Sequence, residues 1–109
     1  MDKESLLKIL FDPTSSDAEK DDAIIELGSN FQDEETVDIL IKVSNDSNFD
    51  EMIAASCGES IAQIWVANQR IDYERLSHLK GITLTEALSL IKAQCPEWYK
   101  RYLELYPQV

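Results

Sequence analysis

The chain has few residues that break helices and few of the patterns that build sheets. Its 109 residues include only three glycines and three prolines. Long alternating runs of β-branched residues are absent, whereas Leu, Ile, Ala, Glu and Lys are common, and this composition favours helices. Hydrophobic residues make up 44% of the chain, enough for one core, and no linker or low-complexity segment divides it. We therefore expect a single all-α domain over residues 1–109.

Side chains that catalyse reactions or bind metals are also scarce. His78 is the only histidine, and Cys57 and Cys95 do not form a Cys-x-x-Cys pair. A structural zinc site therefore lacks ligands, and there is no glycine-rich phosphate loop. Residues 45–51 superficially resemble a calcium loop but have neither its central glycine nor its regular spacing of acids. The sequence predicts no catalytic site, no cofactor and no metal, and we interpret the protein as a binding protein and not as an enzyme.

Membrane and secretion signals are missing as well. No stretch approaches the ~18 uninterrupted apolar residues of a membrane span, and the start of the chain, Met1 to Glu4, does not resemble a signal peptide. Both cysteines lie in apolar helical contexts, which is typical of small buried side chains in a reducing compartment. A disulfide or a redox pair is the alternative. We expect a cytoplasmic protein, with a monomer favoured.

Basic residues are rare in the first half of the chain. Residues 1–60 hold 16 Asp and Glu against four Lys, a net charge of −12. Residues 61–109 hold five acids against six bases, a net charge of +1, and the whole chain carries −11. This charge argues against binding to nucleic acids or to anionic membranes, which need a basic surface. It indicates a basic protein partner that the acidic half attracts and orients.

What is present is a succession of helix signals. Apolar stripes with helical spacing alternate with caps, turns and prolines, and Ser16 to Glu19 and Thr83 to Glu86 each form a capping-box pattern. Gly28 is a predicted C-cap, Asp33 a predicted N-cap and Pro96 a predicted first helical residue. The predicted helices are 4–11, 16–28, 33–44, 50–67, 72–79, 83–93 and 96–106.

The predicted core centres on the helix 50–67, which is apolar nearly all round. One side carries Ile53, Cys57, Ile61, Ile64 and Trp65, and Gly58 in its middle predicts the close approach of a neighbouring helix. The helix 33–44 is expected to bury Val37, Leu40 and Ile41, with Ser44 as a further candidate for the same face. The aromatic group Trp98, Tyr99, Tyr102 and Tyr106 is interpreted as a cap on the end of the core, with an exposed interface as the alternative.

The chain contains an internal repeat with a period near 34 residues. Ala23 to Gly28 superimposes on Cys57 to Ala62, so a helix pair at 17–44 recurs at 50–79, with a clipped third copy at 83–105. Such periods are typical of stacked helix pairs. The tetratricopeptide spacing is absent. The segment Asp21 to Gly28, followed by an acidic start to the next helix, resembles short bacterial HEAT-like repeats, although the arginine usual in their first helix is missing. The resemblance implies a short α-solenoid of six or seven helices; an irregular bundle is the alternative.

A candidate binding surface lies on the helix 33–44 and the loop after it. In a two-helix repeat the second helices line one common face, and the polar side of this helix is nearly all acidic. Tyr73 on a following helix extends the face as an aromatic anchor. The predicted partner-binding residues are Asp33, Glu34, Glu35, Asp38, Asp46, Asp50, Glu51 and Tyr73. The competing face carries Asp17, Glu19, Asp21 and Asp22.

Small acidic helical proteins without a catalytic site are similar to the immunity proteins that bacteria make against their own toxins. HEAT-like members occur among the immunity proteins of contact-dependent inhibition and polymorphic-toxin systems. This resemblance implies an inhibitor that binds a basic toxin, of the nuclease type, whose phosphate-binding cleft the acidic surface blocks. The alternative is a HEAT-like scaffold or adaptor that binds another basic cytosolic protein, and an enzyme subunit is a third hypothesis.

Overall fold

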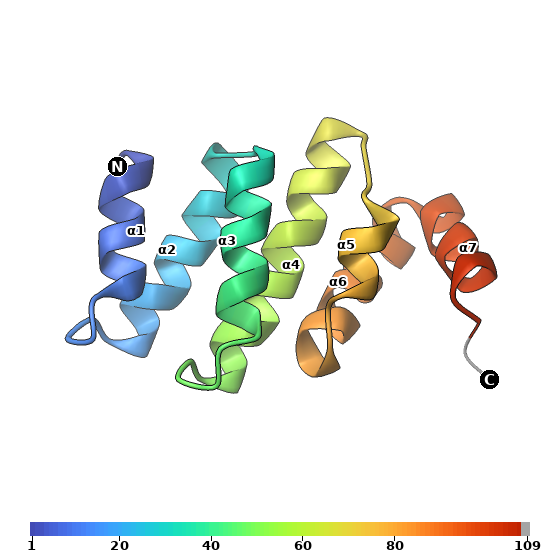
Figure 1. The fold of residues 1–109 in the computed structure, drawn as a ribbon. Coiled ribbons are helices and arrows are strands. Elements are labelled where there is room, and N and C mark those ends of the chain that lie inside the picture. Colours follow the sequence, from blue (N-terminus) through green and yellow to red (C-terminus); the bar gives the residue numbers. More distant parts are fainter. Residues whose placement is uncertain (108–109) are drawn as a thin grey trace.

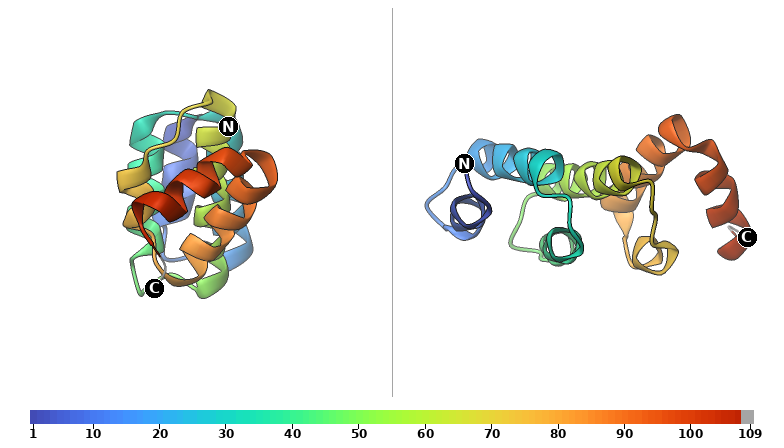
Figure 2. Two further views of the ribbon diagram at one scale, coloured as in Figure 1. Left: turned by 90° about the vertical axis from the view of Figure 1, so that its right-hand side faces the viewer. Right: turned by 90° about the horizontal axis from the view of Figure 1, so that it is seen from above.

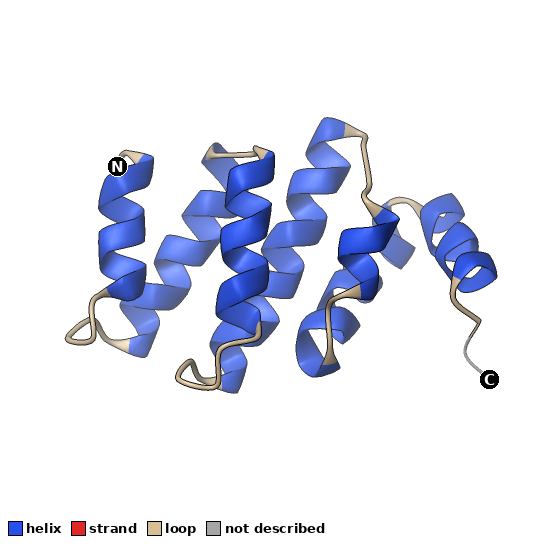
Figure 3. Ribbon diagram, in the orientation of Figure 1, coloured by secondary structure: helices blue, strands red, loops and turns tan. Residues whose placement is uncertain are grey.

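The structure is a computed structural model that describes residues 1–107 (Figures 1 and 3). Within these residues it contains seven α-helices and no strand, which confirms the all-α prediction and the number of helices. The helices are α1 (Lys3–Phe11), α2 (Asp17–Asn30), α3 (Glu34–Ser44), α4 (Glu51–Asn68), α5 (Tyr73–Ser77), α6 (Gly81–Gln94) and α7 (Pro96–Leu105).

The helices form two layers along one long axis (Figures 1 and 2). Helices α1, α3 and α5 lie in one layer, which we call the front layer, and α2, α4 and α6 lie in the other, the back layer. The helix α7 turns away from both layers at the end of the stack and packs on α6. The molecule is elongated, with extents of 42 × 26 × 20 Å.

The helices pair in a different phase from the one that the repeat suggested. The predicted unit 17–44 corresponds to α2 with α3, yet α3 packs mainly against α4 and only slightly against α2, while α1 packs against α2. The repeated helices themselves are correct, since α2 and α4 lie side by side and begin 34 residues apart, at Asp17 and Glu51. A period does not say which helix comes first in each pair, and this explains the error.

Three helices start as the sequence signals predicted. Ser16 and Glu19 form the capping box of α2, Asp33 caps α3, and Pro96 begins α7. Two expected caps are wrong. Gly28 lies inside α2, which continues to Asn30, and Thr83 lies inside α6, which begins at Gly81. In both cases a contact with a neighbouring helix determines the residue type.

The central position predicted for α4 is confirmed, because α4 packs against α2, α3 and α6. All five residues of its predicted core side are at most 5% exposed. On α3, Val37 and Leu40 are buried as expected, but Ile41 and Ser44 are only half-buried, and Thr36 and Val43 are buried with Val37 and Leu40. The aromatic cap is also confirmed: Tyr102 is buried, and Trp98, Tyr99 and Tyr106 pack against the core.

Two glycines bring the helices of the back layer into close contact. A Cβ atom on Gly58 of α4 would lie 2.1 Å from the carbonyl oxygen of Thr83 in α6, and one on Gly28 of α2 would lie 2.7 Å from Cβ of Ser60 in α4. At each contact the hydroxyl of the facing residue donates to a carbonyl four residues before the glycine. Ser60 Oγ donates to Ile24 O at 3.2 Å, and Thr83 Oγ1 donates to Ala54 O at 3.0 Å.

We expect Gly58→Ala to destabilise the protein by about 3 kcal/mol or more, because the added methyl group meets backbone of α6 that cannot rotate away. Chemical denaturation measures the change. The matched control is Gly81→Ala, where φ is +53° but nothing lies within 4 Å of the new Cβ; this change should cost about 1 kcal/mol through backbone strain alone. Equal losses for the two variants would contradict the close contact.

Burial of Cys57 predicts a loss of stability at alkaline pH. The side chain is fully buried, and desolvation, followed by the nearby carboxylate of Asp21, raises the pKa of the thiol to about 12. Between the unfolded pKa of about 9 and this value the unfolded chain loses a proton that the native protein keeps, so stability falls as pH rises. The stability difference between the wild type and Cys57→Ala should therefore fall by about 1.4 kcal/mol per pH unit between roughly pH 9 and 11.

Denaturation at each pH, with Cys95 present in both proteins, isolates the contribution of Cys57. A pH-independent difference, or rapid modification of the Cys57 thiol in the native protein, would show that the thiol is accessible to solvent.

Candidate functional site

Two acids at the start of α3 share an ion pair with Lys3 of α1. Lys3 Nζ lies 3.1 Å from Asp33 Oδ1 and 2.8 Å from Glu35 Oε1. Asp33 also caps α3 by accepting a hydrogen bond from the backbone N–H of Thr36 at 2.8 Å. Burial alone would raise the pKa of Asp33, but the hydrogen bonds from Thr36 and Lys3 outweigh it and hold the pKa below its ordinary value.

Arg75 of α5 approaches α3 from the other side. Its Nε donates to Asp38 Oδ1 at 2.7 Å, and its Nη1 donates to Asp72 Oδ2 at 2.6 Å. The hydrogen bond with Asp38, then the one with Asp72, raises the pKa of the guanidinium above its ordinary value. Because Asp38 lies on α3, Arg75 connects α3 to α5 across the front layer.

These ion pairs change the interpretation of the candidate surface. In the sequence the polar side of α3 is nearly all acidic, yet bases from both neighbouring helices lie against it. The bases are 30 and 37 residues away from their partners, beyond the reach of any i,i+4 pattern. Asp33, Glu35 and Asp38 remain predicted partner contacts, but a partner would have to compete with Lys3 and Arg75 for them.

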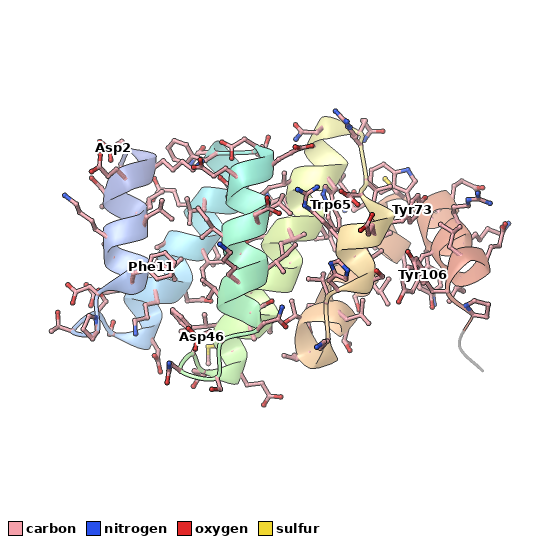
Figure 4. The ribbon with its side chains drawn as sticks, in the orientation of Figure 1. Asp2, Phe11, Asp46, Trp65, Tyr73 and Tyr106 are labelled. Atoms are coloured by element: carbon pink, nitrogen blue, oxygen red, sulfur yellow. The ribbon has the colours of Figure 1, made fainter. Side chains whose placement is uncertain are left out.

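The structure separates the predicted residues into two groups. Asp33, Glu34 and Glu35 lie at one end of α3, and Asp46 lies beyond the other end (Figure 4). A helix of 11 residues is about 16 Å long, so the two groups do not form one cluster. Asp50 and Glu51 follow Asp46 at the start of α4.

The second group joins acids that the sequence analysis had placed elsewhere. The loops before α2 and before α4 lie on the same side of the stack (Figure 1). These loops and the first residues of α2 and α4 carry five exposed carboxylates, which we call the acidic edge: Asp12, Asp17, Asp46, Asp50 and Glu51. Within residues 1–107 none of the five forms an ion pair.

Local hydrogen bonds and aromatic contacts hold the acidic edge in place. Asp12 accepts from the backbone N–H of Thr14 at 2.8 Å, which lowers the pKa of Asp12, and Asp46 and Asp50 accept from backbone N–H groups two residues on. Phe11 and Phe49 pack edge to face with ring centroids 6.4 Å apart, and Lys20 lies over the Phe49 ring at 5.5 Å. Two loops distant in the sequence therefore present one surface.

The first group borders a groove between α3 and α5, which we call the α3–α5 groove. Its cavity volume is about 500 Å³. It is lined by Gln32, Asp33, Glu34, Val37, Ile64, Trp65, Asn68, Arg70, Ile71, Asp72, Tyr73 and Arg75. The structure thus brings Tyr73 together with Asp33 and Glu34, as predicted, and separates it from Asp46, Asp50 and Glu51.

Tyr73 is half-buried at the start of α5, between the groove and α7 (Figure 4). Burial raises the pKa of its hydroxyl, and Arg101 of α7 partly opposes that shift. Trp65 and Arg70 are groove residues that sequence reasoning missed as site residues, because Trp65 was assigned to the core alone. The position of Trp65 in the sequence could have indicated this role, because the residue lies in the last turns of α4, shortly before the non-helical linker at 69–72.

Two of the four acids on the competing face of α2 have internal roles. Glu19 accepts from the backbone N–H of Ser16 at 2.9 Å, and Asp21 accepts from the hydroxyl of Ser56 on α4.

His78 is exposed at the end of α5. Among residues 1–107 no three His, Cys, Asp or Glu side chains converge as metal ligands would. In the same part of the chain no helix has the length and apolarity to cross a membrane.

We expect the Arg75–Asp38 pair to contribute a small, salt-sensitive stabilisation. The side chains are 31% and 50% exposed, so solvent screens their interaction. A double-mutant cycle with Arg75→Gln and Asp38→Asn should give a coupling of about 0.5–1 kcal/mol that decreases with added salt. The matched control is the more exposed pair Arg101–Glu104, for which we expect coupling near zero. Equal coupling in both pairs would contradict a bridging role for Arg75.

Comparison of the chain with models of protein families, with characterised proteins and with solved structures finds no match in any of the three.

Proposed function

We propose that this chain is an immunity protein that binds a basic toxin domain of the nuclease type and neutralises it with the acidic edge. The observation that carries the proposal is the acidic edge itself, where five exposed carboxylates form no ion pair among residues 1–107. Nucleases hold phosphates in basic clefts, and a rigid row of carboxylates has the charge to occupy such a cleft.

The distribution of the chain's own bases supports this proposal. All six bases of residues 61–109 belong to the α4–α5 linker, α5, the residue before α6, α6 or α7, away from the loops of the acidic edge (Figure 1). Lys3 and Arg75 are engaged with α3. Lys20 and Lys42 are the bases that the neighbouring helices α2 and α3 contribute. The resulting asymmetric field would steer a basic partner toward the α1–α4 half and speed its association.

The layered stack is also compatible with the HEAT-like resemblance, which we retain as part of the proposal. Helical-repeat proteins use extended faces for binding and need no catalytic group. An acidic edge formed by the loops at one side of the layers would suit that mode of binding, and the ion pairs of α3 would keep its supporting helices in place.

We expect Asp17→Lys combined with Glu51→Lys to slow association with the toxin by about tenfold at low salt, since the two changes reverse charge at the acidic edge. Both residues are at the first position of a helix and form no ion pair within residues 1–107, so the fold should persist. Glu97→Lys is the matched control, because Glu97 lies in the first turn of α7, is exposed and is far from the edge. It should leave the association rate nearly unchanged.

The biological test uses the product of the neighbouring gene as the candidate toxin. It should arrest growth when expressed alone, and co-expression of this chain should restore growth, less effectively with the doubly reversed variant than with Glu97→Lys. Binding to a product that does not arrest growth would support the scaffold function instead. Growth arrest that this chain does not relieve would refute the immunity function.

A further inference from the structure

The α3–α5 groove exists because the front layer is incomplete. α5 has only five residues and follows the linker 69–72, so it does not pack side by side with α3 along the length of that helix. Arg75 spans the gap to Asp38 through hydrogen bonds, and buried residues of α4 line the base of the space between the two helices at one end. The groove therefore results from the way in which the helices of the stack are arranged.

The floor of the groove is apolar. Val37, Ile64 and Trp65 line it although each is at most 5% exposed, and half-buried Ile71 and Tyr73 form its wall on the side of α5. Large aromatic side chains that are mostly buried and keep one accessible surface are the residues that most often carry binding energy in protein interfaces. The half-buried wall formed by Ile71 and Tyr73, and not the closed floor, offers a large apolar side chain a surface to pack on.

The indole of Trp65 offers an unused hydrogen-bond donor. Trp65 is 5% exposed, and its Nε1 donates no hydrogen bond to any residue within 1–107. Among residues 1–107, Thr36 Oγ1 is fully enclosed and has no hydrogen-bond partner. Trp65 Nε1 also has no partner but is not fully enclosed, so the indole N–H is open to the groove that Trp65 lines. Buried indole N–H groups usually have an acceptor. A backbone carbonyl of a bound segment would supply one.

The charges at the rim of the groove determine which charged side chain of a ligand can bind beside the apolar one. Asp33 and Asp72 are held by Lys3 and Arg75, whereas Glu34 on the α3 side has no ion pair among the described residues. Arg70 on the linker side is likewise unpaired and exposed. Glu34 therefore favours one cation on the α3 side, and Arg70 disfavours a second cation opposite it.

From these observations we propose that the α3–α5 groove binds an extended peptide segment that carries one arginine next to a large apolar residue. The apolar side chain packs against Ile71 and Tyr73 beside the Trp65 indole, a backbone carbonyl accepts from Trp65 Nε1, and the guanidinium pairs with Glu34. The proposal stands on the residues of the groove and not on the acidic edge, so it does not depend on the partner being a toxin.

The test uses the blocked peptide acetyl-Leu-Arg-Leu-amide and NMR of the isotopically labelled full chain. The Trp65 indole N–H signal, assigned with a Trp98→Phe variant, should shift and saturate at millimolar peptide. Acetyl-Leu-Glu-Leu-amide and acetyl-Ala-Arg-Ala-amide should each bind at least about fivefold more weakly, because one loses the pairing with Glu34 and the other loses the apolar contact. Penta-lysine should shift amides of the acidic edge but not the Trp65 indole.

Two variants test the residues. Glu34→Gln should weaken binding of the arginine peptide about fivefold and leave binding of the glutamate peptide no weaker. The matched control Glu97→Gln should change neither. Trp65→Phe keeps an aromatic ring and removes the donor, and its binding, followed through the backbone amide of Val37, should also weaken. The proposal is overturned if the Trp65 signal does not move, if the arginine and glutamate peptides bind equally, or if Glu34→Gln has no effect.

Discussion

The close approach of α4 to α2 and α6 is the constraint on which the rest of the structure depends. Gly28 and Gly58 remove the side chains that would hold the back-layer helices apart, and the hydroxyls of Ser60 and Thr83 satisfy carbonyls across the two contacts. Each glycine costs helix stability, about 1 kcal/mol relative to alanine. That loss is offset because α4 then buries apolar side chains against both neighbours as well as against α3.

The front layer is held together differently, and this difference creates both candidate sites. Its helices are connected to one another through Lys3 and Arg75, which converge on α3 from opposite sides. Ion pairs on an exposed surface position the helices but do not fill the space between them. The gap beside α5 is the α3–α5 groove. The acidic edge arises at the loops, where Phe11, Phe49 and Lys20 bring two turns together without neutralising them.

The sequence predicted what depends on neighbours along the chain. Capping residues such as Ser16 and Asp33 located helix starts, and the apolar surround of α4 placed it at the centre. Features that depend on distant residues were not predictable. The partners of Asp33 and Asp38 come from α1 and α5, Gly28 and Thr83 serve contacts between helices and not helix ends, and a period alone did not fix the pairing of helices. The groove depended on the short length of α5, where the predicted helix was longer.

The acids of this chain therefore fall into two classes with different energetic consequences. Those on α3 are partly compensated by Lys3 and Arg75, so a ligand gains little from them unless it displaces an internal cation. Those of the acidic edge form no ion pair within residues 1–107, so a basic surface that covers them can pair with them without displacing an internal partner. Net charge alone does not distinguish the classes, because both contribute equally to it. A basic partner would therefore gain more binding free energy at the loops before α2 and α4 than at α3. The sequence alone had indicated the acidic side of α3.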